Sequence, residues 1–291
     1  MKDAFLKYLS FEKRLSSHTI TSYSNDLDQF LLFYKNYSYN DNIKKVDRRA
    51  IRSWVVELSL KDLSPGSINR KLATLKSFFK YLIKRSLIRS NPTSGINSLK
   101  TNQEIPQFIK EKDMIYLFDN LELEGGFKGI RDLLILELLY GTGIRISELI
   151  NLKLSDINFI KKEIKVLGKR NKERIIPLHN KSIEQIKKFN RTKEELSIET
   201  SELICTEKGG KAYPMLISRA VKKHLSSLIN SKKYNPHLLR HTFATHILNK
   251  GGDLNSIKDL LGHKSLAATQ IYTHNSIEKL KETFKKSHPR A

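Results

Sequence analysis

The sequence predicts a mainly helical protein of two domains with a small β-sheet. Its 291 residues are about twice the commonest domain size, so two domains are the starting expectation. Apolar residues recur at helical spacing along most of the chain, whereas strand-like runs are short and confined to the second half. Strands this short exclude a doubly wound parallel sheet.

We predict four helices for an N-terminal domain at residues 1–90. The second and fourth carry apolar stripes at helical spacing. Asp47 and Ser64 stand where the third and fourth helices begin and suit N-caps, and Pro65 suits the first position of a helix. The four helices are expected near residues 2–14, 18–36, 47–60 and 65–85.

Residues 91–105 are predicted to be a linker. The stretch lies between Asn91-Pro92 and Ile105-Pro106, and a proline disfavours helical backbone at the residue before it. Its Ser, Asn and Gly residues offer little apolar surface to bury. The C-terminal domain then covers residues 106–291.

In this second domain the pattern is mixed. Helices are expected near residues 110–122 and 129–140, and helical spacing returns from Met215 to the end. Short strand-like runs are expected at residues 163–167, 174–177 and 203–206.

The charge of the chain points to a polyanionic partner. Its 53 Lys and Arg against 30 Asp and Glu give a net charge of +23. Residues 1–100 carry 19 Lys and Arg against 8 Asp and Glu, so the N-terminal domain is the more densely basic part. The charge is spread over both domains rather than along one amphipathic helix, and no apolar run reaches the ~18 residues of a membrane span. Nucleic acid is therefore the first candidate partner, and an anionic membrane surface is a second candidate that the spread of the charge disfavours.

The cysteine content and the N-terminus predict a cytoplasmic protein. Cys205 is the single cysteine, so it cannot form an internal disulfide. The first residues lack the apolar stretch and cleavage site of a signal peptide. No His pair lies beside a carboxylate at ligand spacing on a helix, so any nucleic-acid chemistry is expected to be either metal-free or built from scattered carboxylates.

Four segments carry candidate chemistry. Arg145 ends a glycine-flanked turn, Gly141-Thr142-Gly143-Ile144-Arg145, that follows the most apolar helix. His237 and Arg240 lie three apart and share one face of a predicted helix. The other two segments are a charged turn, Gly168-Lys169-Arg170-Asn171-Lys172-Glu173-Arg174, and the run Leu260-Leu261-Gly262-His263, which is followed nine residues later by Tyr272.

In order and spacing these segments resemble the tyrosine recombinases of the phage integrase family. The phrases Gly-Thr-Gly-Ile-Arg-Ile-Ser-Glu-Leu and Leu-Leu-Gly-His-Lys-Ser are most similar to bacterial Xer recombinases. Arg170 departs from the family, which usually has glycine there, and this change bears on how the turn carrying Lys169 moves. The resemblance implies a catalytic set of Arg145, Lys169, His237, Arg240, His263 and Tyr272.

The resemblance also implies an architecture and partners. It implies a SAM-like, four-helix DNA-binding domain and a C-terminal catalytic domain that together clamp DNA. Within the family, four protomers, of one recombinase or of two paralogous ones, act on two DNA sites. A helix at residues 276–286 would dock on the neighbouring protomer. A septal DNA translocase is a candidate activator of such a complex. The implied task is site-specific recombination, such as the resolution of chromosome or plasmid dimers.

The chemistry of the residues supports this interpretation. Two arginines can hold the non-bridging oxygens of a phosphodiester with bidentate hydrogen bonds. Tyr272 is a weak nucleophile with an ordinary pKa of about 10 unless a base assists it, and His237 is the candidate base. Lys169 can protonate the departing 5′-oxygen, and His263 can donate a hydrogen bond to the phosphate. Such a set is expected to form a 3′-phosphotyrosine bond with neither a metal nor another cofactor, and a hydroxyl of a second DNA strand can reverse the attack.

Other interpretations stay open. Each residue alone has an ordinary explanation, such as a surface histidine or a hairpin lysine. An integrase of a phage or mobile element shares the chemistry but often has an extra N-terminal domain, which we do not expect before Lys2. A non-catalytic DNA-binding protein would lack part of the set. Five further residues are expected to support the site or the fold: Asp132, Glu148, His241, His246 and His274.

Overall fold

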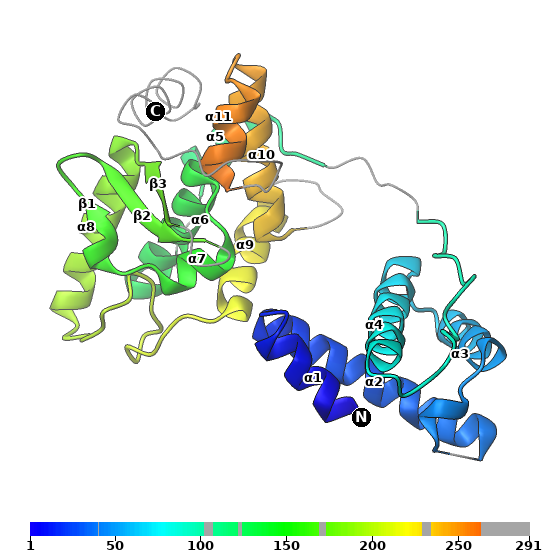
Figure 1. Cartoon of the computed structure of the whole chain (residues 1–291). Helices are drawn as coiled ribbons and strands as arrows, with labels where there is room; N and C mark the ends of the chain where they lie inside the picture. Colours follow the sequence, from blue (N-terminus) through cyan, green and yellow to red (C-terminus); the bar gives the residue numbers. More distant parts are fainter. Residues whose placement is uncertain (40, 102–106, 122–123, 169–172, 229–233, 263–291) are drawn as a thin grey trace. The chain divides into compact units, whose positions relative to one another are not determined.

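The computed structural model describes residues 1–39, 41–101, 107–121, 124–168, 173–228 and 234–262. The chain divides into two compact units, Met1–Glu104 and Ile105–Ala291. Each unit, whose helices and strands are labelled in Figure 1, has its own hydrophobic core.

Four α-helices form the N-terminal unit, as predicted. Ser64 accepts a hydrogen bond from the backbone N–H of Ser67 at 3.4 Å, and Asp47 caps the third helix through Ala50 at 2.8 Å. Both predicted N-caps are therefore confirmed. The helices are α1 (Lys2–Phe11), α2 (Ser17–Ser38), α3 (Arg48–Leu60) and α4 (Pro65–Lys84), with a short 3₁₀ turn η1 (Ile43–Lys45) before α3.

The core of this unit is rich in aromatic rings. Trp54, the single tryptophan of the chain, is 1% exposed and packs edge-on against Phe30 with ring centroids 5.0 Å apart. Phe5 and Phe78 pack in the same way at 5.2 Å. These contacts bring α1 to α4 together around one centre.

A buried carboxylate joins α2 to α4. Asp26 is 1% exposed and accepts hydrogen bonds from Lys71 at 3.0 Å and from the Thr74 hydroxyl at 2.9 Å. Arg70 also pairs with Asp26, and its side chain remains 48% exposed. Because Lys71 is itself buried, this ion pair compensates two charges that would otherwise be costly to remove from water.

The segment after α4 buries more of its side chains in the N-terminal unit than its polar composition predicts. Thr93 and Ile96 are buried. The Asn69 side chain donates to the carbonyl of Leu99 at 2.9 Å and accepts from its N–H at 2.7 Å. Part of the stretch predicted as a linker therefore buries side chains, which the sequence analysis did not expect.

The C-terminal unit is helical around a small sheet. It begins with α5 (Glu111–Asp119), α6 (Gly126–Thr142), α7 (Ile146–Asn151) and the 3₁₀ turn η2 (Leu154–Asp156). The sheet contains β1 (Ile157–Asn158), β2 (Glu163–Leu167) and β3 (Glu173–Pro177). The remaining helices described are α8 (Asn180–Glu195), α9 (Pro214–Leu228), α10 (Pro236–Asn249) and α11 (Leu254–Leu261).

The sheet is antiparallel in the order β1-β2-β3, with Ile164 opposite Ile176. Helix α6 lies at the centre of the unit in contact with α8, α9 and α10, and nearly all of its residues from Leu134 onward are buried. The most apolar predicted helix is thus the core helix, and the mainly helical fold class with a small sheet is confirmed.

This unit differs from the prediction in several details. Residues 203–205 are buried, but instead of a strand they contribute one isolated bridge, at Cys205, and a second isolated bridge lies at the preceding Glu202. Helices α7 and α8 and strand β1 were not predicted. The apolar character of the run reflects burial in the core, which strands and irregular segments share.

Candidate active site

A tight turn places Arg145 at the start of α7. Helix α6 ends at Thr142, and Gly143 continues the chain with a φ of +60°, where a side chain would also collide with Phe243. The Thr142 hydroxyl accepts from the N–H of Ile144 at 3.2 Å. The backbone of Arg145 is thereby fixed at the N-cap of α7.

Glu148 holds Arg145 in place. The carboxylate accepts from the backbone N–H of Arg145 at 2.8 Å and from its Nη1 at 2.9 Å. Nη2 of the same guanidinium donates to the carbonyl of Gly262 at 2.7 Å. The Glu148 side chain is 3% exposed, whereas that of Arg145 is 30% exposed, so the cation is the part that solvent or a ligand can reach.

Arg174 approaches the same carboxylate from β3. Its Nη1 and Nη2 donate to the two oxygens of Glu148 at 2.6 and 2.8 Å, and its Nε donates to the carbonyl of Leu260 at 2.8 Å. The side chain is 5% exposed. A planar guanidinium can donate two parallel hydrogen bonds to a carboxylate and a third to another acceptor, a geometry that the ammonium of lysine does not reproduce.

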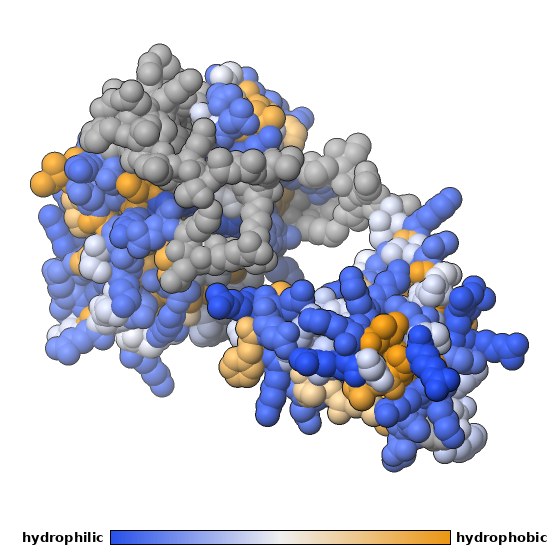
Figure 2. Space-filling view, in the orientation of Figure 1, coloured by the Kyte–Doolittle hydropathy of each residue, from blue (hydrophilic) through white to orange (hydrophobic). Residues whose placement is uncertain are grey.

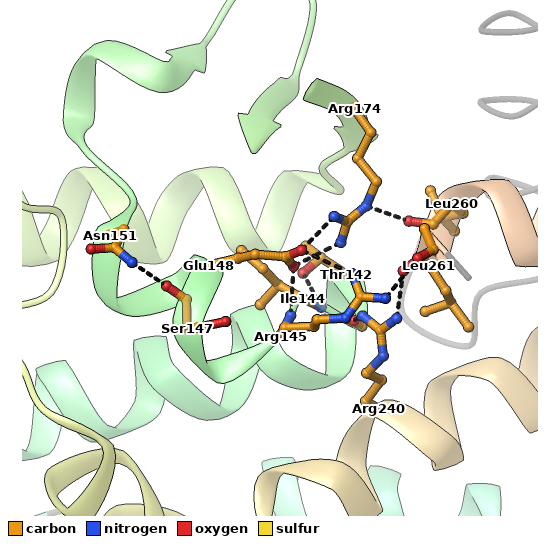
Figure 3. A network of polar contacts seen from close by, with 12 residues as sticks. Thr142, Ile144, Arg145, Ser147, Glu148, Asn151, Arg174, Arg240, Leu260 and Leu261 are labelled. Atoms are coloured by element: carbon orange, nitrogen blue, oxygen red, sulfur yellow. Dashed lines mark hydrogen bonds and ion pairs between the residues drawn. The ribbon is translucent and has the colours of Figure 1, made fainter. Parts of the chain in front are cut away.

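Arg240 reaches the cluster from α10. Its guanidinium donates to the backbone carbonyls of Gly143 and Leu261. Figure 3 shows that Arg145, Arg174 and Arg240 point toward one another and toward the end of α11. The turn after α6, the third strand and two helices therefore meet at one cluster.

The ionisation of the cluster follows from burial and neighbouring charge. Burial lowers the pKa of Arg240 to about 10, with the positive charges of Arg145 and Arg174 acting in the same direction. Burial also disfavours the charged form of Glu148, but the hydrogen bonds and charges of its two arginines outweigh it and hold its pKa below the ordinary value of 4.5. At neutral pH all four groups are charged.

Two guanidiniums therefore bond one carboxylate, and the third, that of Arg240, acts on it only through its charge. The cluster has a net charge of about +2, since arginine stays protonated and Glu148 stays ionised. A partly exposed site with excess positive charge and planar donors is suited to an oxyanion such as a phosphodiester.

The structure brings together two of the predicted residues, Arg145 and Arg240, which bond adjacent carbonyls at the end of α11. His237 lies exposed in the first turn of α10, three residues before Arg240. Lys169, Arg170, His263 and Tyr272 lie outside the described residues, as do His274 and the predicted helix at residues 276–286.

Sequence reasoning did not single out Arg174. Arg174 lies on the buried face of β3, as does Ile176. A charged residue on the buried face of a strand is the signal that could have identified it, because a buried charge needs a partner. Glu148, which was expected only to support the site or the fold, is the acceptor that joins Arg145 and Arg174.

Two other predicted support residues lie in separate contacts. Asp132 accepts from the Nε of Arg131 at 3.0 Å and lies 3.5 Å from the Nε2 of His224 on α9, so it joins α6 to α9. His246 contacts the Tyr140 hydroxyl at 3.0 Å and the carbonyl of Ile109 at 2.8 Å, so it joins α10 to α6 and to the chain before α5. Both are buried and hold elements of the fold together.

The described residues also bear on metal binding and on membrane insertion. Within the described ranges, no group of three or more His, Cys, Asp or Glu side chains is arranged to hold a metal ion. None of the helices described combines the length and the apolar character that a membrane span needs. Hydrophilic residues cover most of the visible described surface of both units (Figure 2).

Comparisons with known proteins point to one family. Residues 107–279 match the phage integrase family, and residues 3–86 match the phage integrase N-terminal SAM-like domain. The chain is 37% identical over 316 residues to tyrosine recombinase XerC of Chlorobaculum parvum, covering 99% of this chain and 94% of the relative. It is 40% identical over 291 residues to tyrosine recombinase XerC of Thermodesulfovibrio yellowstonii, covering 98% and 95%.

Solved structures share the fold. The site-specific recombinase XerH, bound to palindromic difH substrate after cleavage, has a TM-score of 0.73 at 21% identity and covers 97% of this chain and 93% of its own. The Tn1549 transposon integrase in complex with transposon right end DNA has a TM-score of 0.73 at 19% identity and covers 96% and 99%. From the matched residues and the near full-length relatives, the chain belongs to the phage integrase family, and its activity is site-specific tyrosine recombination of the Xer type.

Proposed function

We propose that this enzyme breaks and rejoins DNA strands without a metal ion, through a 3′-phosphotyrosine bond to Tyr272. The observation that supports this most is the arginine cluster, in which Arg145 and Arg240 converge on one partly exposed site. Their charge can meet the charge that develops on the phosphate oxygens, the task that metal ions perform in other nucleases.

The proposed cleavage step balances as a transesterification. The Tyr272 oxygen attacks the phosphorus as His237 takes the phenolic proton, and the bond from phosphorus to the 5′-oxygen breaks. Lys169 gives a proton to the departing 5′-oxygen, and His263 donates a hydrogen bond to the phosphate. The 3′-phosphate stays on the tyrosine, so a 5′-hydroxyl of another strand can reverse the step with no energy source.

Arg145 and Arg240 can serve the phosphate while they hold α11. Each terminal guanidinium nitrogen carries two N–H groups, so a nitrogen that donates to a carbonyl also has a second hydrogen. Glu148 orients Arg145 through its backbone N–H and its Nη1. The arginine is thereby held in one geometry before the substrate arrives, which reduces the cost of ordering it in the transition state.

The proposal also assigns a role to each part of the chain and names its partners. Residues 1–90 provide grip on duplex DNA, residues 91–105 join the two parts, and residues 106–291 hold the chemistry. The excess of basic residues in the first part supports the first assignment. Four protomers act on two DNA sites, a septal DNA translocase is a candidate activator, and the expected location is the cytoplasm.

The test is covalent trapping. The substrate is candidate chromosome-terminus DNA with a nick beside the scissile phosphate. On cleavage the short fragment that carries the new 5′-hydroxyl dissociates, so the protein stays attached to the 3′-phosphate. Tyr272→Phe removes one oxygen and little packing area, so it is expected to abolish the adduct while DNA affinity stays within about 3-fold. An adduct that persists in Tyr272→Phe would contradict the assignment of the nucleophile.

A further inference from the structure

Three successive carbonyls at the end of α11 each accept a hydrogen bond from a different arginine. Leu260 accepts from Arg174 at 2.8 Å, Leu261 from Arg240, and Gly262 from Arg145 at 2.7 Å. The last carbonyls of a helix have no partner within it and carry the negative end of its dipole. The arginine cluster therefore caps the C-terminus of α11.

Arg174 differs from the other two arginines of this cap. Its side chain is 5% exposed, and its three hydrogen bonds run to the two oxygens of Glu148 and to Leu260. Arg145 is much more exposed and shares the Oε1 atom of Glu148 with Arg174. Arg174 is thus placed to hold the partners of Arg145 rather than to touch a ligand.

The fit around Gly262 supports this arrangement. Gly262 has a φ of +61° and ends α11 as its C-cap. A Cβ added at this position would lie 3.3 Å from Nη1 of Arg145 and 3.4 Å from Cδ of Arg174. The end of α11 therefore fits closely between the two arginine side chains, and a shift of Arg174 changes the space available to both.

We propose that Arg174 is a positioning residue for the recombination reaction, which couples the orientation of Arg145 to the end of α11. It does so through Glu148 on one side and the Leu260 carbonyl on the other. Gly262 directly precedes His263 in the chain, so the same cap sets where the chain leaves α11 toward that residue. The inference rests on the proposed function, because its effect is measured on DNA cleavage.

Arg174→Lys is the informative variant because it preserves the charge. A lysine ammonium cannot donate in one plane to both oxygens of Glu148 and to Leu260. We expect single-turnover adduct formation at saturating DNA to fall about 10-fold or more, as misplacement of a transition-state donor does. DNA affinity is expected to stay within about 3-fold, because Arg174 is buried and contributes no phosphate contact.

A substrate without the charge on its scissile phosphate distinguishes mispositioning of Arg145 from a merely structural defect. In a methylphosphonate, a methyl group replaces one non-bridging oxygen at the scissile position. We expect the defect of Arg174→Lys to shrink to about 3-fold or less on this substrate, in parallel with that of Arg145→Ala, because both act on the charge of the phosphate. Equal defects on both substrates, or no defect on the phosphate, would overturn the proposal.

Hydrogen exchange supplies a second readout. The amides at the end of α11 are expected to exchange faster in Arg174→Lys than in the unaltered protein, and unchanged exchange there would overturn the link to α11. Arg191→Lys, an exposed change on α8, is the matched control for both measurements. If the unaltered protein forms no adduct with the nicked substrate, the proposed function fails; if it does and Arg174→Lys matches it, only this inference fails.

Discussion

Asp26 and Glu148 are both buried carboxylates that pair with two cationic side chains, yet their networks are built differently. The cations of Asp26, Arg70 and Lys71, are neighbours on the single helix α4. The cations of Glu148 come from the N-cap of α7 and from β3. One network joins two helices of the N-terminal unit, whereas the other brings separate elements of the C-terminal unit to one point.

The difference concerns what the cations do besides neutralising the carboxylate. Lys71 also donates to the side chain of Gln29, so both of its hydrogen-bond partners lie on α2. Arg145 and Arg174 donate in addition to main-chain carbonyls at the end of α11, where Arg240 adds another positive charge. We infer that the Asp26 network serves stability and the Glu148 network serves positioning, and substitutions can test that division.

The largest expected effect is on catalysis. Arg145→Ala and Arg240→Ala should each slow adduct formation about 100-fold or more, since each removes a donor to the transition state. The measurement is single-turnover trapping on the nicked substrate at saturating DNA. Arg191→Ala, which removes an exposed arginine from α8, is the control and should react at the unaltered rate. Rates within a few-fold of the unaltered protein would show that Arg145 and Arg240 only bind.

The next effect is on stability. Asp26→Ala leaves the buried Lys71 ammonium without its carboxylate and should lower the free energy of unfolding of the N-terminal unit by about 3 kcal/mol. Trp54, the single tryptophan and buried in that unit, reports this unfolding by fluorescence in urea.

The control for this stability measurement lies on the same helix. Asp28 is 58% exposed and pairs with Lys2 at 2.6 Å, so Asp28→Ala should cost no more than about 1 kcal/mol. Under conditions where Asp26→Ala is folded, its adduct formation at saturating DNA should stay within a few-fold of the unaltered rate. An Asp26→Ala protein that is fully stable but defective in cleavage would break the comparison.

The smallest effect is a pH dependence. The pKa of Glu148 is below its ordinary value of 4.5 in the folded protein, so its ionised form adds stability that is present above about pH 5 and is lost as the pH falls through the folded pKa. The difference in unfolding free energy between the unaltered protein and Glu148→Gln should therefore be constant from pH 8 to about 5.5 and shrink below about 4.5. Urea unfolding followed by circular dichroism measures it, and a difference that already shrinks between pH 7 and 6 would contradict the assigned direction.

The N-terminal unit follows closely from its sequence because its helices depend on local signals. Each predicted helix agrees with the structure within a few residues, and Asp47 and Ser64 cap the helices they precede. Apolar stripes and capping residues act within one or two turns, so a single sequence displays them.

The C-terminal unit differs from its prediction where the sequence signal for an element is weak or where the residues in contact are far apart in the chain. Helix α8 is dominated by polar residues, and its N-cap is His179, which accepts from the N–H of Ser182 at 3.2 Å although histidine is not a preferred capping residue. The contacts of Arg174 run to Glu148 and Leu260, which are 26 and 86 residues away in the chain. Contacts over that range come from the tertiary fold, so the sequence identified Arg145 and Arg240 through resemblance but not the residue that holds their surroundings together.

The central claim is that arginines, rather than metal ions, meet the charge of the phosphate in this enzyme. The most direct measurement is the rate of covalent adduct formation on the nicked substrate in excess EDTA and in excess Mg²⁺, with DNA affinity measured under both conditions. We predict the same rate in both, because Arg145 and Arg240 already supply the positive charge that meets the phosphate. An adduct that disappears in EDTA and returns with Mg²⁺, while DNA affinity stays unchanged, would contradict the claim.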